Sequence, residues 1–449
     1  MNLSRKIGLV SATSIVVANM IGAGIFTTSG LILANTHDPI LLLILWFVGG
    51  IIALCGALSY GELGAAMPEA GGEYLFLAKL YHPLIGFLSG WTSLLVGFSA
   101  PIAASAIGSS EYLIQAFPNT GHLLIEATGI SAAFWMKTVA IVIIMSFTIL
   151  HAKGVKSGTR VQNVLTGLKV LIITVMIVAA FLSGKGDTSH FWVGTPQNTS
   201  SIWYTFGLSL MWILFAYSGW NASTYIGSEI KQPGKNLPRS LVAGTTLVII
   251  LYLLLNIVFV YAIPPDKMKG VIAVGSLAMG KLFGPSIEKL FSLMIALALF
   301  SSLSAFIIIG PRVYYAMARD HLFFKSIAKV HPAHHVPSKA IIAQGILAIV
   351  YVITGSFEQI LTYMGFSLGI FPILAVFGIF ILRKKANQHP TMPGYPFVPI
   401  IFILASVSIL ILAFLNRPLE SSLAIAILIL GIPVYYFFYR REHTKNIKA

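Results

Sequence analysis

The sequence predicts an all-α polytopic membrane protein, because the chain is apolar almost from end to end. Of its 449 residues, 57% are hydrophobic and only 10% are charged, and the mean hydropathy is +0.87. An ordinary soluble domain carries far more charge than this. Apolar segments of about 20 residues, the length that crosses ~30 Å of hydrocarbon, recur along the whole chain. These observations exclude a soluble globular protein.

Twelve apolar segments are predicted to span the membrane. The first is too long for the apolar region of a signal peptide and lacks a small-residue cleavage site, so we expect it to stay as a span. The predicted spans lie near residues 6–33, 39–66, 83–116, 134–152, 159–183, 201–230, 239–263, 287–317, 340–355, 358–382, 396–415 and 420–439.

The span at 6–33 is interrupted by Gly22, Ala23 and Gly24. A glycine pair weakens a helix and lets the backbone open, which lipid tolerates only where that backbone is buried in protein or lines a cavity. The N–H groups that begin the next half-helix would then form a site for a carboxylate. The alternative is that the glycines allow two helices to pack closely.

The span at 201–230 is interrupted at Ser218 and Gly219. Two interrupted spans in corresponding positions of two halves indicate a transporter binding site. Spans one to five and spans six to ten form two sets, and each set begins with an interrupted span. Because five is an odd number of spans, the second set enters the membrane in the opposite direction to the first. The sequence therefore predicts an inverted repeat, with repeat 1 at residues 1–183, repeat 2 at 184–395, and a further span pair and tail at 396–449.

Two ionisable residues lie inside predicted spans and are functional candidates, because charges in a membrane are energetically expensive. Lys169 lies nine residues beyond Arg160, which is about 13 Å along a helix. Its ammonium could reach the inner interface or make a fixed structural contact. Alternatively, it could occupy a cation position between spans and exchange a proton there. Glu111 lies toward the outer end of the span at 83–116.

The distribution of charge predicts the orientation in the membrane. The net charge of +15 is concentrated in alternate connecting segments, as the positive-inside rule requires, so both termini are predicted to be cytoplasmic. The expected neighbours are anionic lipid headgroups and not nucleic acid. Lys and Arg gather at 151–160, 231–240, 383–385 and 440–448 and are absent at 34–38, 117–133 and 355–357.

The segment at 73–81 is too short to span and is predicted to be an interfacial or re-entrant helix on the inner side.

The sequence contains no pattern typical of an enzyme or of a metal site. Cys55 is the single cysteine, so no intramolecular disulfide forms. His331, His334 and His335 lack the helical spacing and the carboxylate of a metal site. The spans hold no paired Asp, HExxH motif or Ser/His dyad. We expect no cofactor, no metal and no catalysis.

An ordered set of motifs resembles the amino acid–polyamine–organocation superfamily, and within it the bacterial relatives of the L-type amino acid transporters. The resemblance covers almost the whole chain and implies the five-plus-five inverted-repeat fold of the leucine transporter, with twelve transmembrane helices of which the first and sixth are broken. The motifs are GAGIF (22–26), FAYSGWN (215–221), SEIKQPGKNLPRS (228–240), RVYYAMARDHLF (312–323), VHP (330–332) and PGYPFVPIIFILAS (393–406).

The resemblance implies a substrate held by its α-carboxylate and α-ammonium groups. The carboxylate would bind the opened backbone of the first span, where the family more often has Ser in place of Ala23. The ammonium would meet carbonyls at both interruptions, and Phe215 corresponds to an aromatic gate. The small neutral Ser218 favours neutral amino acids. The predicted substrate-binding residues are Met20, Ile21, Gly22, Ala23, Gly24, Phe215, Ala216, Ser218 and Asn221.

The resemblance also bears on coupling and on partners. Lys169 matches a family lysine whose ammonium replaces a sodium ion, which places it near Ser302 and implies sodium-independent transport. The predicted coupling residues are therefore Lys169, Ser302 and Glu111. Eukaryotic relatives are tied to a glycoprotein through a cysteine in the loop after the third span. The loop at 117–133 contains none, so no disulfide-linked heavy chain is expected.

The sequence thus predicts a secondary transporter of neutral L-amino acids in the cell membrane, acting as an exchanger or with a coupled proton. One alternative is an amino acid–amine (polyamine) antiporter, which needs a carboxylate deep in the site. Glu111 is the only buried candidate expected, and its outer placement counts against this alternative. The other is a transporter-like nutrient receptor, which tends to carry large cytoplasmic extensions; the tails before Lys6 and after Arg440 are short.

Overall fold

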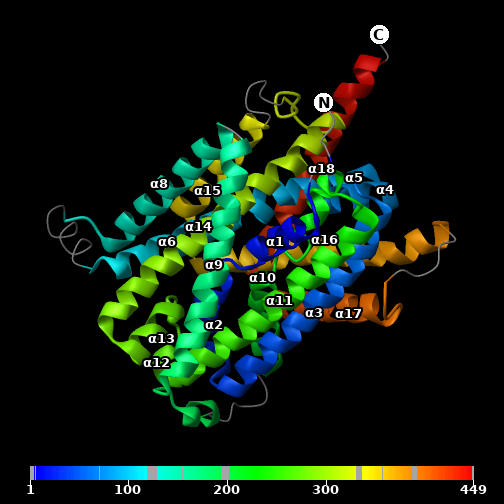
Figure 1. The fold of residues 1–449 in the computed structure, drawn as a ribbon. Helices are drawn as coiled ribbons and strands as arrows, with labels where there is room; N and C mark the ends of the chain where they lie inside the picture. The colour runs from blue at the N-terminus through cyan, green and yellow to red at the C-terminus, as the bar shows by residue number, and fades with distance from the viewer. Residues whose placement is uncertain are drawn as a thin grey trace.

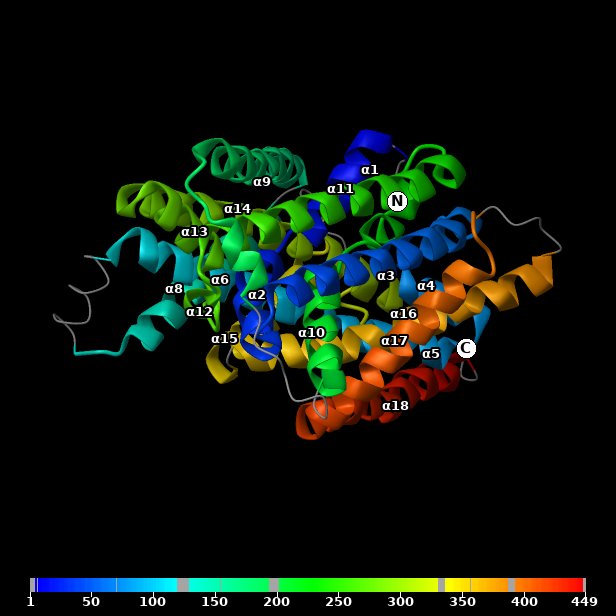
Figure 2. The ribbon, with the colours of Figure 1, turned by 90° about the horizontal axis from the view of Figure 1, so that it is seen from below.

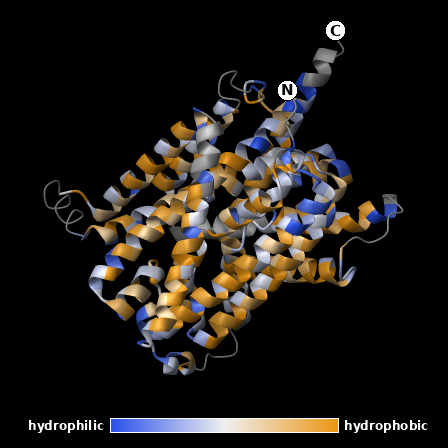
Figure 3. Ribbon diagram, viewed as in Figure 1, coloured by the Kyte–Doolittle hydropathy of each residue, from blue (hydrophilic) through white to orange (hydrophobic). Residues whose placement is uncertain are grey.

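The chain folds into a bundle of helices that run side by side (Figure 1). The computed structural model describes residues 5, 7–69, 71–118, 129–153, 155–193, 202–329, 336–355, 357–386 and 392–446, and within these ranges there is no strand beyond one bridge between Ile7 and Ile230. Hydrophobic residues cover most of the length of the helices, and hydrophilic residues gather toward their ends (Figure 3). This distribution is that of a multi-pass membrane protein.

Nine helical segments in the described part of the chain are long and apolar enough to cross a membrane. Most match the predicted spans closely. The predicted span at 340–355 forms a shorter apolar helix, and the predicted span at 201–230 is helical only in its first half. The nine segments are Leu9–Thr36, Pro39–Ala66, Pro83–Ala116, Ala132–Ala152, Val164–Ser183, Pro233–Ala262, Pro285–Arg319, Phe397–Asn416 and Pro418–Arg441.

The first apolar run forms two helices, α1 (Leu9–Met20) and α2 (Ala23–Thr36). Ile21 and Gly22 separate them, and Gly22 has φ −117° and ψ −158°. This extended backbone cannot continue the hydrogen-bond ladder of a helix. The interruption thus lies at the glycine pair, and α2 begins there with no side chain capping its N-terminus.

The next segment ends in a short helix at one end of the bundle. The long helix α3 (Pro39–Ala66) begins at Asp38, whose carboxylate accepts two backbone N–H groups at 2.8 and 3.1 Å. Gly71 and Gly72 then adopt φ +121° and +54°, a region that favours glycine, and turn the chain into α4 (Glu73–Leu80). Because of this turn, the first residue of α4 points into the bundle.

The third predicted span contains a local irregularity. Helices α5 (Pro83–Thr92) and α6 (Ser99–Ala116) are joined by a π-helical segment, Ser93–Phe98. Such wide turns occur mostly as single insertions and often lie at functional sites.

The sixth apolar run departs from the prediction of two half-helices. Helix α10 (Ile202–Ala216) ends at the interruption, but the chain beyond it forms only two 3-10 turns, at 222–225 and 227–229. Polar side chains compete with helix formation here, since Thr224 Oγ1 donates to the carbonyl of Asn221 at 2.7 Å. An irregular stretch therefore crosses this part of the protein, and α11 (Pro233–Ala262) follows it.

The remaining helices are α8 (Ala132–Ala152), α9 (Val155–Ser183), α12 (Pro265–Met268), α13 (Val274–Phe283), α14 (Pro285–Arg319), α15 (Ser338–Thr354), α16 (Phe357–Ala386), α17 (Phe397–Asn416) and α18 (Pro418–Asn446).

Helix α10 lies near the middle of the bundle, between α2 and α17 in the view of Figure 2. It also contacts α3 and α16, while α3 packs along α11 and α6 along α14. In Figure 1, α4 and the end of α18 lie at one end of the bundle, and α12 and α13 lie near the other.

Candidate functional site

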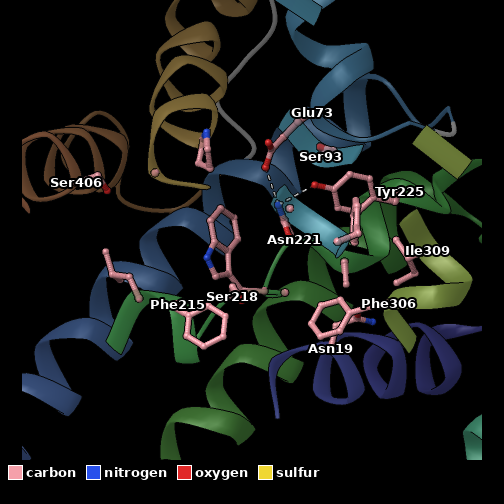
Figure 4. Close-up of a pocket in the computed structure, with 18 of the residues that line it drawn as sticks. Asn19, Glu73, Ser93, Phe215, Ser218, Asn221, Tyr225, Phe306, Ile309 and Ser406 are labelled. Carbon is pink, nitrogen blue, oxygen red and sulfur yellow. Dashed lines mark hydrogen bonds between the residues drawn. The ribbon is translucent and has the colours of Figure 1, made fainter. Parts of the chain in front are cut away.

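A cavity of about 110 Å³ lies beside the interruption after α10 (Figure 4). Phe215, Ser218 and Asn221 line it from that interruption, and Asn19 lines it from the last turn of α1. Phe306 of α14 and Ser93, Gly97 and Phe98 of the π-helical segment form another part of the wall. Residues of α4, α16 and α17 supply the rest. The cavity is therefore bounded by both broken runs and by the helices packed around them.

Gly219 brings the interrupted sixth run against α1. Its φ of +99° is a conformation that side chains rarely adopt, and a Cβ atom there would lie 2.8 Å from the backbone carbon of Asn19. Both conditions exclude any residue except glycine without a shift of the backbone. Gly219 thus fixes how closely the two interruptions approach each other.

Gly24 has a packing function as well as a place at the interruption. A Cβ atom on Gly24 would lie 2.6 Å from both Cα and Cβ of Ala216, where α2 crosses α10. Gly24 therefore allows two helices to pack closely, as the alternative interpretation of the glycine pair predicted. Gly22 differs, because a Cβ atom there would meet nothing closer than 3.9 Å, and one of its nearest neighbours would be Ser302 Oγ.

The predicted substrate-binding residues fall into two groups in the structure. Phe215, Ser218 and Asn221 line the cavity. The others are buried next to it but form no part of its described wall; these are Met20, Ile21, Gly22, Ala23, Gly24 and Ala216. The first turn of α2 has four N–H groups without intrahelical partners, as every helix does.

Lys169 is completely buried, with 0% of its surface exposed. Its ammonium donates to the carbonyls of Ala18 and Ile21 at 3.1 and 2.5 Å and to Ser302 Oγ at 2.8 Å. These three acceptors use all three donors of a lysine ammonium. The interpretation that Lys169 reaches the inner interface is wrong, because its ammonium is buried and hydrogen-bonded at the interruption between α1 and α2.

The carbonyl oxygens at the interruptions already have partners. Ile21 O accepts from Lys169 and also from Ser302 Oγ at 2.7 Å, which uses both of its lone pairs. The Tyr252 hydroxyl of α11 lies 2.6 Å from Met20 O and 3.0 Å from Ala216 O. Tyr252 therefore joins the two broken runs, and no sequence signal separates it from its apolar neighbours.

The structure corrects the expectation that Glu111 is the only buried carboxyl group. Glu111 is partly exposed and takes no part in the cavity wall, whereas Glu73 is 7% exposed and lines it. The sequence signal was the pair of glycines before Glu73, which turn the start of α4 inward. Cys55 is buried and unpaired, and His331, His334 and His335 lie outside the described residues.

Comparison with known proteins gives a consistent result. A sequence model of the family described as "Amino acid permease" matches residues 7–434. The chain is 31% identical over 449 residues to the serine/threonine exchanger SteT of Bacillus subtilis, covering 98% of each chain. It is 29% identical to the b(0,+)-type amino acid transporter 1 of Mus musculus, over 98% of this chain and 88% of that one. It is 30% identical to the mouse large neutral amino acids transporter small subunit 2, over 98% and 82%.

Proposed function

The chain belongs to the amino acid permease family, and from this premise we propose that it moves neutral L-amino acids across the cell membrane by alternating access. Family membership makes it a transporter and not an enzyme. The observation that carries the proposal is the cavity between Asn19 and the unwound stretch around Ser218, because opened backbone beside a cavity is how membrane transporters hold small polar substrates.

We assign the substrate's carboxylate to the uncapped start of α2, at Gly22, Ala23 and Gly24. The ammonium is assigned to Met20 O and Ala216 O. Each of these oxygens has one described partner, the Tyr252 hydroxyl, and so keeps a lone pair, whereas Ile21 O has none left. Phe215 and Asn221 would meet the rest of the substrate.

The larger architecture that we propose is the five-plus-five inverted repeat with twelve spans. Repeat 1 takes residues 1–183, repeat 2 takes 184–395, and two further spans with the tail take 396–449. The broken first and sixth runs support it, since they stand at corresponding positions of the two repeats. Both termini would be cytoplasmic, and no disulfide-linked heavy chain is expected, because the one cysteine is buried.

The transport mode that we favour is sodium-independent exchange, with proton coupling as the other form of the same mechanism. Lys169 places its ammonium group at the interruption, where it would take the position of a sodium ion. The relative from Bacillus subtilis is named an exchanger, and this supports exchange. An amino acid–amine antiporter is the second candidate, because Glu73 supplies the carboxyl group that such a substrate would require.

Uptake of radiolabelled amino acids into proteoliposomes tests the proposal. A panel of neutral, cationic and acidic amino acids and a diamine is offered, with and without internal amino acid and with sodium replaced by choline. We expect uptake of neutral amino acids only, dependent on internal substrate and independent of sodium. Uptake of the diamine would favour the antiporter, and binding to purified protein without any uptake would indicate a receptor.

Substitution Tyr252→Phe is expected to slow uptake by about three- to tenfold with little change in thermal stability. It removes one hydroxyl, and a buried hydrogen bond contributes about 0.5–1.5 kcal/mol. The ring keeps its packing against Trp46 and Tyr217, with centroids 5.4 and 5.0 Å away. Initial uptake rates and melting temperatures measure the two effects.

Tyr217→Phe is the matched control for this experiment. It removes a hydroxyl from the same aromatic cluster, where Tyr217 donates to Trp46 O at 3.1 Å and touches neither Met20 O nor Ala216 O. We expect a smaller effect on uptake than that of Tyr252→Phe. Equal effects would mean that the link between the two broken runs is unimportant.

A further inference from the structure

The carboxyl group of Glu73 is a buried acid in the cavity wall (Figure 4). Its Oε1 accepts a hydrogen bond from Asn221 Nδ2 at 2.7 Å, and the same Nδ2 lies 3.3 Å from the hydroxyl of Tyr225. Asn221 belongs to the unwound stretch that we assign to substrate binding. A change at Glu73 is therefore transmitted by one hydrogen bond to the binding site.

The groups that face this carboxyl are polar but uncharged. They are Tyr60 from α3, Asn221 and Tyr225 from the unwound stretch, and Ser93 from the π-helical segment at the cavity wall. No Lys, Arg or His side chain within the described ranges forms an ion pair with Glu73. An ionised carboxylate buried without a cation is strongly destabilising. Burial accordingly raises the pKa of Glu73 to about 7, against hydrogen bonds that lower it.

The position of Glu73 is held by contacts on both sides. The N–H of Gly71 donates to Tyr225 O at 3.4 Å, and a Cβ atom on Gly72 would lie 2.5 Å from the Tyr225 ring. One residue further, the Tyr74 hydroxyl donates to Asp320 at 2.5 Å, at the end of α14. Helix α4 thus connects the unwound stretch to α14. The protonation of Glu73 can therefore affect how α4 packs against both of them.

We propose that Glu73 is a proton-binding site of the cavity and that transport of a neutral amino acid requires its protonated form. This inference rests on the proposed function and adds the residue through which pH acts. With the proton bound, the cavity carries no net charge and can close around a neutral substrate. Without it, the carboxylate draws in water and repels the substrate's own carboxylate.

The direction of the pH effect follows from this assignment. The acid is neutral below a pH of about 7 and ionised above it, so the closed, neutral cavity is lost as the pH rises through that value. For one such group the protonated fraction falls about tenfold between pH 6 and pH 8. Exchange of a neutral amino acid should slow by about the same factor.

The test measures exchange in proteoliposomes at equal internal and external pH, from 5.5 to 8.5, with radiolabelled serine as the probe. Wild type should lose about tenfold of its rate from pH 6 to pH 8. Glu73→Gln mimics the protonated acid and should flatten the profile, so that it exchanges faster than wild type at pH 8. Glu69→Gln is the matched control, because its carboxylate is 58% exposed and paired with Lys79, and it should keep the wild-type profile.

A wild-type profile in Glu73→Gln, or no pH dependence in wild type, would overturn the inference and leave the proposed function standing. Absence of uptake by wild type at every pH would overturn the proposed function and the inference together. If Glu73→Gln does not fold, Glu73→Asp replaces it. This shorter acid cannot reach Asn221 in the same way, so the midpoint of the profile should move, and an unmoved midpoint would overturn the inference.

Discussion

Gly24→Leu is expected to abolish amino acid binding and transport. Even the single Cβ atom of an alanine would lie 2.6 Å from Cα and Cβ of Ala216, and one of these is a backbone atom that cannot rotate away. Overpacking a tight contact by a methyl group costs about 1–3 kcal/mol, which is about a 5- to 150-fold loss. A leucine side chain must force α2 and α10 apart, and with them the two interruptions that bound the site.

Binding of radiolabelled substrate to purified protein and its melting temperature are the measurements for this series. Gly167→Ala in α9 is the control, since a Cβ atom there would meet nothing within 4 Å and Gly167 lies outside the assigned site. It should bind substrate within a few-fold of wild type. The double variant Gly24→Ala with Ala216→Gly should recover part of the loss of Gly24→Ala, because one of two close contacts is removed. Retained affinity in Gly24→Leu would refute the close-packed carboxylate site.

Features that depend on local sequence could be predicted, and this explains the agreement for the fold. Apolar length and composition are local properties, so the all-helical membrane bundle follows from them. The interruption at Gly22 also follows from local chemistry, because glycine lets the backbone leave the helix. The extent of the second interruption does not, since it depends on specific hydrogen bonds, from Thr224 Oγ1 to Asn221 O and between Ser223 and the distant Ser240.

The parts of the site that could not be predicted are set by distant segments. Glu73 is separated by 148 residues from Asn221, and only the inward turn of α4 brings them together. Tyr252 looks like any tyrosine in an apolar run until the fold brings its hydroxyl to a carbonyl oxygen of each interruption. The proximity of Lys169 and Ser302, 133 residues apart, came from the family resemblance and from no local pattern.

Lys169→Ala is expected to reduce turnover by about 100-fold or more while substrate affinity changes by less than about tenfold. Hydrogen bonds to a charged group contribute about 1.5–3 kcal/mol each, and a loss of 3 kcal/mol is about 150-fold. The ammonium joins Ala18 and Ile21 at the first interruption to Ser302 of α14, and none of these four residues lines the cavity. The substitution therefore disturbs the relation between helices more than the contacts of the substrate.

Two further variants separate the charge of Lys169 from its packing. Lys169→Met keeps an unbranched side chain without the ammonium, and Ser302→Ala keeps the ammonium but removes one of its acceptors. Uptake rates against substrate concentration in proteoliposomes should give a low kcat for Lys169→Met and a smaller decrease for Ser302→Ala. A wild-type kcat in Lys169→Met would remove the charge from the mechanism.

Lys169→Arg tests whether a positive charge alone is sufficient. The guanidinium is planar and larger than an ammonium, and the site offers three acceptors around a completely buried point charge. We expect Lys169→Arg to be as slow as Lys169→Ala, because the larger head group cannot occupy this position without separating α1 from α14. Recovery of turnover by arginine would show instead that the site requires only charge, and that the interruption adjusts to the group that supplies it.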